Sequence, residues 1–273
     1  MSENIEPIDR AAAYGDGLFE TIAIRDGKPR FWSMHSERLQ TGCARLGLPC
    51  PQADALLAKL ETTIATATIE TGFAAAKLTV AAGTTGRGYQ RDPRADPSVR
   101  ISLHTARILP AQNYQSGIAT RLCTTRLAVQ PLLAGIKSLN RLEQVIARAE
   151  WDDENIFEGL MLDTDGRLIC GTMSNVFIVK KSAVITPAVT RCGVAGIMRR
   201  HLVSLLQKEA GIACEVRDVA ADELNAADEV FLSNSQFGVL PVRTCTSMQW
   251  DIGPITRRAQ TIAAGDGVPE CSQ

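Results

Sequence analysis

A lysine with the surroundings of a reactive amine lies in the stretch AGIKSLNRLEQV, residues 134–145. Lys137 shortly precedes Asn140 and Glu143, whose N-x-x-E spacing is typical of a helix start, where each side chain can cap a backbone N–H group. Cations are disfavoured at this positive end of a helix dipole. Lys137 therefore either points into solvent or has a lowered pKa. An amine of lowered pKa is a good nucleophile that can form a Schiff base.

Two other stretches and two arginines could bind anions. The loop GTTGRGYQR places Arg87 and Tyr89 among glycines, and a guanidinium suits carboxylates. This loop lacks the lysine and serine or threonine that end a nucleotide-binding P-loop. The stretch GIMRRHLVSLLQ predicts a helix that begins near Gly196, and the free N–H groups of such an N-terminus bind anions. Arg38 and Arg141 are each either an anion partner or a surface residue of a helix.

Composition limits the function classes. The 273 residues suit one large domain or two of ordinary size, with 45% apolar and 22% charged residues, as in globular proteins. A formal net charge of −1 gives no field that would attract nucleic acid or acidic lipid. Eight scattered cysteines without a CxxC pair, and three isolated histidines, predict neither a disulfide scaffold nor a metal site. We expect reduced thiols in the cytoplasm.

The same sequence predicts no membrane association. The start, MSENIEPIDR, is polar and acidic and lacks the basic and apolar regions of a signal peptide. No apolar run approaches the roughly 20 residues that span a bilayer.

Helices and strands alternate irregularly along the chain. Asp26 and Gly27 form a strong turn signal between the strands LFETIAI and PRFW. Apolar periodicity predicts helices over 33–48, 53–67, 140–153 and 196–211. Single strands are predicted over 18–24, 74–85, 99–108, 117–128 and 183–189. The stretch 158–180 predicts two strands joined by a turn at Asp165 and Gly166, and the stretch 213–235 predicts two strands with a short helix between them. The stretch ILPAQNYQSG has no periodicity and predicts a linker.

We therefore expect an α/β (α+β) protein of two domains with mixed sheets. The expected boundaries are an N-terminal domain over 1–107, a linker over 108–117, and a C-terminal domain over 118–273 that carries Lys137.

Eight motifs in order resemble one enzyme family over nearly the whole chain. They are AYGDGLFET (13–21), HSERL (35–39), GTTGRGY (83–89), LAGIKSLNRLEQV (133–145), EGLMLDTDGRL (158–168), MSNVF (173–177), GVAGIMR (193–199) and ADEVFLSNSQFGVLPV (227–242). The chain resembles the fold-type IV pyridoxal 5′-phosphate (PLP) enzymes, which include branched-chain and D-amino-acid transaminases. The resemblance to the family's 4-amino-4-deoxychorismate lyases is the strongest.

The resemblance implies a role for each motif. The lysine of the GIK motif, Lys137, would hold PLP covalently. Arg38, the backbone amides of Ile197 and Met198, and the turn of Ser235 and Gln236 would bind the PLP phosphate. Thr21 would face the cofactor and pass a proton to the departing enolpyruvyl group. Each of these residues also has an ordinary structural explanation when its motif is taken alone, as a strand threonine, a helix arginine, a helix start or a polar strand end.

One residue departs from the family pattern. In many relatives a glutamate five residues before the asparagine of the SNxF-like motif keeps the PLP ring nitrogen protonated. Counting back from Asn175 gives Cys170, and a thiol is a poor partner for a pyridinium. Glu158 belongs to a different strand motif. Weaker electron withdrawal disfavours a transaminase more than a lyase, because the aromatic product itself drives the elimination.

The resemblance thus implies a lyase that converts 4-amino-4-deoxychorismate to 4-aminobenzoate and pyruvate in folate synthesis. Arg87 and Tyr89 are candidates for binding the two substrate carboxylates. The family implies a homodimer. Two alternatives remain: a transaminase of D- or branched-chain amino acids, and a PLP-binding protein without catalysis, for which Cys170 is the single argument.

Overall fold

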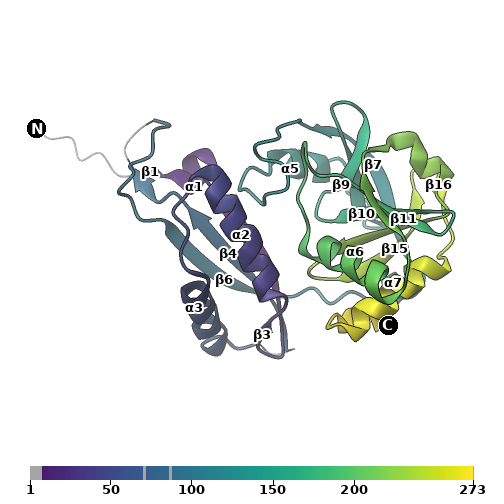
Figure 1. Cartoon of the computed structure of the whole chain (residues 1–273), viewed down its shortest axis with the longest axis horizontal. Coiled ribbons are helices and arrows are strands. Elements are labelled where there is room, and N and C mark those ends of the chain that lie inside the picture. Colours follow the sequence, from purple (N-terminus) through teal and green to yellow (C-terminus); the bar gives the residue numbers. More distant parts are fainter. Residues whose placement is uncertain (1–7, 70–71, 86–87, 273) are drawn as a thin grey trace, which may run out of the picture. The chain divides into compact units, whose positions relative to one another are not determined.

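The computed structural model describes residues 8–69, 72–85 and 88–272. The chain forms two compact units (Figure 1). The N-terminal unit contains Met1–Ala106 together with Ile136–Asn140, and the C-terminal unit contains Arg107–Gly135 and Arg141–Gln273. The mixed α/β class agrees with the prediction. Lys137, however, was expected in the C-terminal domain and belongs to the N-terminal unit.

The N-terminal unit is built on an antiparallel sheet in the order β3-β2-β4-β6. Its strands are β2 Gly17–Arg25, β3 Lys28–Pro29, β4 Phe73–Ala81 and β6 Ser98–Thr105, and the short strands β1 Ile8–Asp9 and β5 Thr84–Thr85 pair separately. Asp26 and Gly27 both have positive φ, 48° and 72°, as a tight hairpin turn requires. The second hairpin strand is only two residues long, because helix α2 begins at Trp32.

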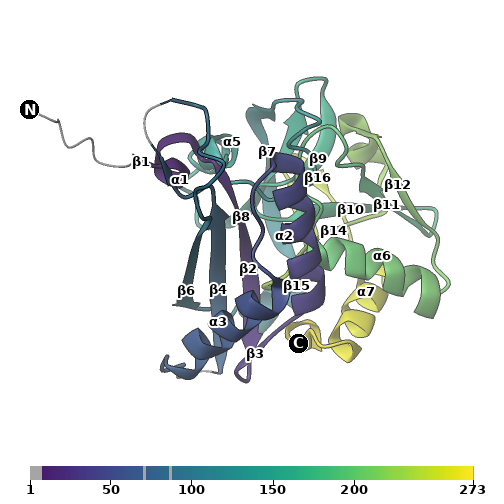
Figure 2. The ribbon, with the colours of Figure 1, turned by 60° about the vertical axis from the view of Figure 1, so that its left-hand side comes forward.

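Helices α2 Trp32–Leu46 and α3 Ala53–Ala65 cover one face of this sheet (Figure 2), and the five-residue α1 Arg10–Tyr14 precedes β2. Alternation along β2 directs Leu18, Glu20, Ile22 and Ile24 toward the covered face, where all four are buried. A Cβ at Gly42 would lie 2.7 Å from Leu18, so this glycine allows α2 to approach the sheet closely.

The segment 136–140 extends the sheet beside β2. The Phe19 N–H donates to the Lys137 carbonyl at 2.9 Å, the Leu139 N–H donates to the Gly17 carbonyl at 2.9 Å, and Ser138 bridges Leu18 in antiparallel fashion. These backbone bonds are the physical reason that Lys137 belongs to the N-terminal unit.

The C-terminal unit contains a ten-stranded mixed sheet in the described residues, with the order β12-β11-β10-β14-β15-β7-β8-β9-β13 and β16 beside β15. The strands are β7 Ile118–Leu127, β8 Ile156–Asp163, β9 Arg167–Gly171, β10 Asn175–Lys180, β11 Ala183–Pro187, β12 Cys214–Arg217, β13 Val219–Ala220, β14 Glu229–Asn234, β15 Gly238–Cys245 and β16 Met248–Gln249. The pairs β11–β12, β15–β7 and β7–β8 are parallel, and the other pairs are antiparallel.

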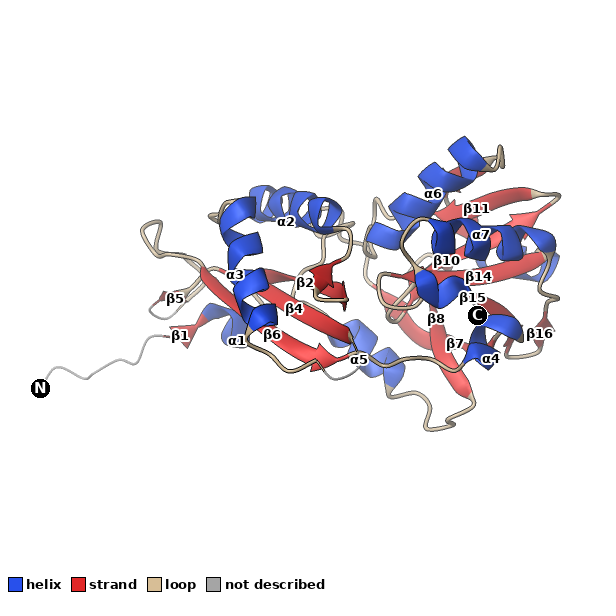
Figure 3. Cartoon of the chain, turned by 90° about the horizontal axis from the view of Figure 1, so that it is seen from below, coloured by secondary structure: helices blue, strands red, loops and turns tan. Residues whose placement is uncertain are grey.

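Helices α6 Ile197–Glu209 and α7 Pro254–Gly265 lie side by side on one face of the strands β10, β14 and β15 (Figure 3). The 3₁₀ helices are η1 Ala221–Ala226 and η2 Pro269–Ser272. The expected linker contains helix α4 Ala111–Gln115, whose Tyr114 is buried and donates its hydroxyl to the Phe237 carbonyl at 3.1 Å. No helix in the described ranges is long and apolar enough to cross a bilayer.

Helix α5 differs most from its prediction. It spans only Leu142–Arg148, and its N-cap is Arg141 without a side-chain cap. The predicted capping box does not form, because Asn140 donates to the Gly15 carbonyl at 3.4 Å and Glu143 accepts from the Ala128 N–H at 2.7 Å. The apolar face predicted for this helix is largely exposed, with Leu142 75%, Val145 61% and Ile146 57% accessible.

Candidate active site

Lys137 lies in an extended segment of the N-terminal unit and not at a helix start. Helix α5 begins five residues later, so its dipole, which acts within about one turn, does not explain an unusual amine. The Lys137 Nζ lies instead 4.3 Å from the centroid of the Phe19 ring, in a half-buried position. An ammonium over an aromatic face is attracted by the ring quadrupole, which holds this amine on the sheet.

Thr21 and Lys77 lie on the same face of the sheet as Phe19, opposite to α2 and α3. They are directly paired across β2 and β4, and the Lys77 Nζ lies 5.3 Å from the Phe19 centroid. Two amines therefore approach one aromatic ring. Within the described residues Lys77 forms no ion pair. Sequence reasoning missed Lys77, although it is the one charged residue in the strand FAAAKLTVA.

On the helix-covered face, Glu20 connects two residues of α2. The Arg38 Nε donates to Glu20 Oε1 at 2.8 Å and the Arg38 Nη2 pairs with Oε2, while the His35 Nδ1 lies 2.6 Å from Oε2. Burial raises the pKa of Glu20, but the charge of Arg38 and the hydrogen bond from His35 outweigh burial and lower this pKa to about 2. The carboxylate is therefore charged at neutral pH.

His35 is held in its neutral form. Burial lowers the pKa of His35 more than the hydrogen bond to Glu20 raises it, and the charges of Arg38 and Lys137 lower it further. The positive charge of Lys137 thus disfavours the protonated form of His35. Sequence reasoning selected Arg38 but missed Glu20 and His35. Two features of the sequence could have indicated this cluster. His35 and Arg38 have the i, i+3 spacing that places both on one face of a helix, and Glu20 is a charged residue within an otherwise apolar strand.

The glycine loop after β4 carries two predicted substrate contacts. Arg87 lies outside the described residues. Tyr89 is 86% exposed, and its ring packs against Tyr14 with a centroid distance of 5.4 Å.

In the C-terminal unit, the N-terminus of α6 has the properties of an anion site. The N-cap Gly196 has no side chain to cap the helix, and no acidic residue lies in the first turn. The first helical hydrogen bond runs from the Arg200 N–H to the Gly196 carbonyl, so the amides of Ile197 and Met198 precede it. A Cβ at Gly196 would lie 1.9 Å from Asn175 Oδ1, which explains why glycine is required here. The side chains of Ile197 and Met198 are buried, so only their amides are suited to bind an anion.

The turn of Ser235 and Gln236 lies between β14 and β15 and is shaped by Asn234. The Asn234 Oδ1 accepts from the N–H groups of Gln236 and Phe237 at 2.9 and 3.0 Å, and its Nδ2 donates to the Met173 carbonyl at 3.3 Å. Asn175, two residues after Met173, donates to the Val194 carbonyl at 3.0 Å just before α6. The side-chain amides of Asn175 and Asn234 thus connect the motifs MSNVF, GVAGIMR and ADEVFLSNSQFGVLPV within the C-terminal unit.

Cys170 is buried in an apolar cluster with Cys123, Met161 and Cys192. Burial raises the pKa of its thiol to about 12, so the thiol is neutral. The sequence left open whether Arg141 is an anion partner or a surface residue of a helix. In the structure Arg141 is half-buried, and burial lowers the pKa of its guanidinium.

Glu158 lies next to the turn that follows Cys170, although its motif is on the neighbouring strand. Its fully buried carboxylate accepts five hydrogen bonds: from the N–H groups of Gly159, Thr172 and Met173 at 3.0, 3.0 and 3.1 Å, and from the hydroxyls of Thr172 and Ser174. Burial raises the pKa of Glu158, and these donors oppose that effect. The donors occupy the acceptor capacity of the carboxylate, which therefore organises the turn 172–174.

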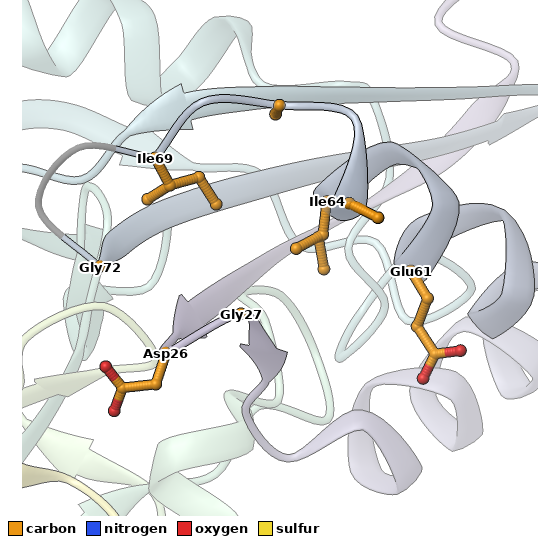
Figure 4. Close-up of a pocket in the computed structure, with 8 residues that line it drawn as sticks. Asp26, Gly27, Glu61, Ile64, Ile69 and Gly72 are labelled. Atoms are coloured by element: carbon orange, nitrogen blue, oxygen red, sulfur yellow. The ribbon is translucent and has the colours of Figure 1, made fainter.

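A separate pocket of about 500 Å³ lies at the far end of the N-terminal sheet (Figure 4). Its lining includes Asp26, Glu61, Ile64 and Ile69, and none of the predicted site residues. In the described residues no group of three or more His, Cys, Asp or Glu side chains could hold a metal ion.

Comparisons with known proteins match most of the chain. Residues 17–245 match the family model described as amino-transferase class IV. The aminodeoxychorismate lyase of Vibrio harveyi is 37% identical over 92% of this chain and 93% of its own length. The D-alanine aminotransferase of Bacillus licheniformis is 30% identical over 93% of this chain and 88% of its own.

A solved structure extends this similarity to the fold. The crystal structure of 4-amino-4-deoxychorismate lyase from Pseudomonas aeruginosa matches with a TM-score of 0.90 and 43% identity, over 98% of this chain and 96% of that one. The match of the family model over most of the chain, and relatives of this identity over more than 90% of its length, show that the chain belongs to the amino-transferase class IV family.

Proposed function

We propose that this chain is a PLP-dependent lyase that converts 4-amino-4-deoxychorismate to 4-aminobenzoate and pyruvate, a step of folate synthesis. The observation that carries the proposal is the position of the Lys137 amine, 4.3 Å from the Phe19 ring and on the same sheet face as Thr21. Two relatives add support, because the lyases of Vibrio harveyi and Pseudomonas aeruginosa match at 37% and 43% identity and the D-alanine aminotransferase of Bacillus licheniformis at 30%.

Each unit, taken by itself, contains residues that suit one group of PLP. Lys137 supplies an amine for the aldehyde, and the uncapped start of α6 at Ile197 and Met198 suits the phosphate. Ser235 and Gln236 are assigned to the same phosphate. PLP, when bound, supplies the electron sink that makes the substrate carbon acidic. Arg38 is oriented by Glu20, and we assign it to the phosphate because a planar guanidinium suits a phosphate.

Two residues move protons in the proposed reaction. The Lys137 Nζ accepts the proton from the amine-bearing ring carbon of the substrate. The bond from the neighbouring ring carbon to oxygen then breaks, and the enolpyruvyl group leaves. The Lys137 Nζ returns this proton through the Thr21 hydroxyl to the methylene carbon of that group, which gives pyruvate, and both residues end in the state in which they began. The ring becomes aromatic, which makes the step favourable.

The ring nitrogen of PLP is the point at which this chain differs from many relatives. We assign Cys170 to the neighbourhood of this nitrogen, and its neutral thiol cannot stabilise a pyridinium by charge. The carboxylate of Glu158 is already occupied by five donors. A PLP ring that withdraws electrons weakly is compatible with a lyase, because formation of the aromatic product itself drives the elimination. Weak electron withdrawal disfavours the alternative transaminase.

The substrate carries two carboxylates. Lys77 is a cation that approaches the same Phe19 ring as the Lys137 amine, and we assign it to one of these carboxylates. Arg87 and Tyr89 are the other candidates for binding the carboxylates. A lysine without an ion-pair partner on an open sheet face is well suited to bind an anion.

We further propose that the protein is a cytoplasmic homodimer. The exposed side chains of Leu132, Leu142, Val145, Ile146 and Met173 form apolar surface on the C-terminal unit, which supports a partner. No disulfide bond forms among the eight cysteines, which is compatible with a reducing compartment. The charge of −1 and the absence of basic patches in the sequence give no reason to expect nucleic acid or membrane partners.

The test is pyruvate release. The substrate is generated in situ from chorismate, glutamine and the synthase, and pyruvate is measured with lactate dehydrogenase. We expect release by the wild-type holoenzyme, none by Lys137→Ala, and wild-type release by the exposed control Lys28→Ala. PLP bound without release would contradict the lyase. Transfer of the amino group from D- or branched-chain amino acids to 2-oxoglutarate would then support a transaminase, and no reaction would support a binding protein.

A further inference from the structure

The chain reaches the start of helix α6 through an irregular segment that follows β11. Backbone hydrogen bonds hold the last part of this segment within the C-terminal unit. The Gly135 N–H donates to the Gly193 carbonyl at 3.0 Å, and the Ala195 N–H donates to the Gly135 carbonyl at 3.0 Å. The direction in which the first amides of α6 point therefore depends on how these few residues are held.

Asn175 holds the same segment from the sheet. Its side chain is 7% exposed, and its Nδ2 donates to the Val194 carbonyl at 3.0 Å. Its Oδ1 lies against Gly196, because a Cβ on that glycine would be 1.9 Å from this oxygen. Asn175 begins β10, an inner strand between β11 and β14, and its backbone is paired with Ser233. A side chain on a fixed strand thus contacts the residues on both sides of Ala195.

The close approach of Asn175 explains the glycine at the N-cap of α6. The backbone of Gly196, with φ −63° and ψ 141°, has a conformation that any residue adopts. Apart from Asn175, the nearest atom to a Cβ at this position would be the Arg199 Cβ at 3.5 Å, an ordinary contact. A serine, threonine, asparagine or aspartate here would cap and stabilise the helix. The glycine forgoes this cap, which leaves the first amides of α6 open to a ligand and lets Asn175 lie against the helix start.

We infer that Asn175 is a positioning residue that fixes the start of α6 and so directs the amides of Ile197 and Met198 toward the cofactor phosphate. The inference rests on the proposed function, which assigns these amides to the phosphate of PLP. Amides that are held before binding lose less conformational freedom when an anion arrives. Loss of the Asn175 contacts therefore weakens binding of the phosphate group and leaves the reaction of Lys137 with the aldehyde unaffected.

The experiment titrates the full chain, freed of cofactor, with PLP and with pyridoxal, which has the same aldehyde and no phosphate. Asn175→Ala removes the contacts to Val194 and Gly196. We expect the Kd for PLP to rise about tenfold and the Kd for pyridoxal to change by less than about twofold. A change that merely loosens the protein would weaken both ligands, so the ratio of the two constants reports on the phosphate. The control is Asn155→Ala, which changes an exposed asparagine and should match wild type.

Gly196→Ala tests the same contact from the helix. Its added methyl group would collide with the Asn175 Oδ1, so the Kd for PLP should rise about tenfold. In the Asn175→Ala background this space is open, and Gly196→Ala should then raise the Kd by less than about twofold. The matched control is Gly265→Ala on α7, whose methyl group would have no atom within 4 Å and should leave the Kd unchanged.

The inference is overturned if the ratio of the two Kd values in folded Asn175→Ala equals that of wild type, or if Gly196→Ala costs the same affinity in both backgrounds. Should Asn175→Ala not fold, the ratio in Gly196→Ala decides the question in its place. Wild type that binds PLP no more tightly than pyridoxal would also contradict the inference. Neither constant depends on turnover, so a protein that binds PLP and releases no pyruvate ends the proposed lyase, while the binding ratio still decides the role of Asn175.

Discussion

Arg38 and Glu20 form a two-point ion pair inside the N-terminal unit, in which Nε donates to Oε1 at 2.8 Å and Nη2 pairs with Oε2. Glu20 is 2% exposed and Arg38 11% exposed, so both groups of the pair are largely removed from water. Two parallel bonds fix the plane of the guanidinium. The pair with Glu20 thus fixes the orientation of Arg38, the predicted phosphate-binding residue.

Glu20→Gln should destabilise the N-terminal unit. The amide cannot neutralise Arg38, and a buried charge without its partner costs roughly 3 kcal/mol or more. Urea unfolding measures this loss, with the exposed Glu61→Gln on α3 as a control that should stay within about 0.5 kcal/mol of wild type. Equal midpoints for Glu20→Gln and wild type would mean that the pair contributes no net stability.

The same pair predicts a pH dependence. The pKa of Glu20 falls from 4.5 to about 2 on folding, so its charged form stabilises the protein above pH 4.5 and this contribution is lost as the pH falls toward 2. By linkage it amounts to about 3 kcal/mol. The difference in unfolding free energy between wild type and Glu20→Gln should therefore shrink as the pH is lowered from 5 to 2. A constant difference across this series would rule out Glu20 as the titrating group.

Local signals explain which elements were predictable. The turn at Asp26 and Gly27 depends on a backbone conformation that two residues determine, and it was predicted correctly. The helix predicted over 33–48 also agrees closely with α2, which ends at Leu46 because Gly47 adopts the left-handed conformation. The capping box at Asn140 and Glu143 was wrong, because Asn140 binds a carbonyl 125 residues away in sequence. No local pattern reveals such a partner.

In the candidate site, too, the residues within local motifs were predictable and their distant partners were not. The resemblance selected Lys137 and Arg38 from their motifs. It did not reveal that Lys137 pairs with β2, that Glu20 holds Arg38, or that Glu158 accepts five hydrogen bonds near Cys170. These relationships depend on which strand lies beside which, and strand order follows from packing of the whole chain.

Lys77→Met should weaken substrate binding more than catalysis. The change keeps the length of the side chain and removes the charge next to the Phe19 ring, so we expect KM to rise about tenfold with kcat changed less. Lys77→Arg should retain most of the affinity. The matched control is Lys59→Met on α3, which should leave KM unchanged. If kcat falls and KM is constant, Lys77 acts on the chemistry and not on a substrate carboxylate.

Ile146→Glu should disrupt the proposed dimer. Ile146 is 57% exposed on α5, near other exposed apolar side chains, and a charge in an apolar interface is costly. Light scattering coupled to gel filtration should show a shift toward monomer. Val216→Glu changes a 52% exposed residue on β12 and should leave the mass unchanged. A dimer that survives Ile146→Glu would place the interface on a different surface.

Glu158→Gln should loosen the turn that follows Cys170. A glutamine offers one acceptor oxygen, and its NH2 group would face the Met173 N–H and the Ser174 hydroxyl, so two donors lose their acceptor. Leaving buried donors unsatisfied costs roughly 2 kcal/mol or more, measured by urea unfolding. Because Asn234 ties Met173 to the turn of Ser235 and Gln236, PLP affinity should fall as well. The control is Glu154→Gln, which changes an exposed residue and should match wild type. If Glu158→Gln is destabilised but binds PLP with unchanged affinity, the Glu158 carboxylate does not contribute to the phosphate site.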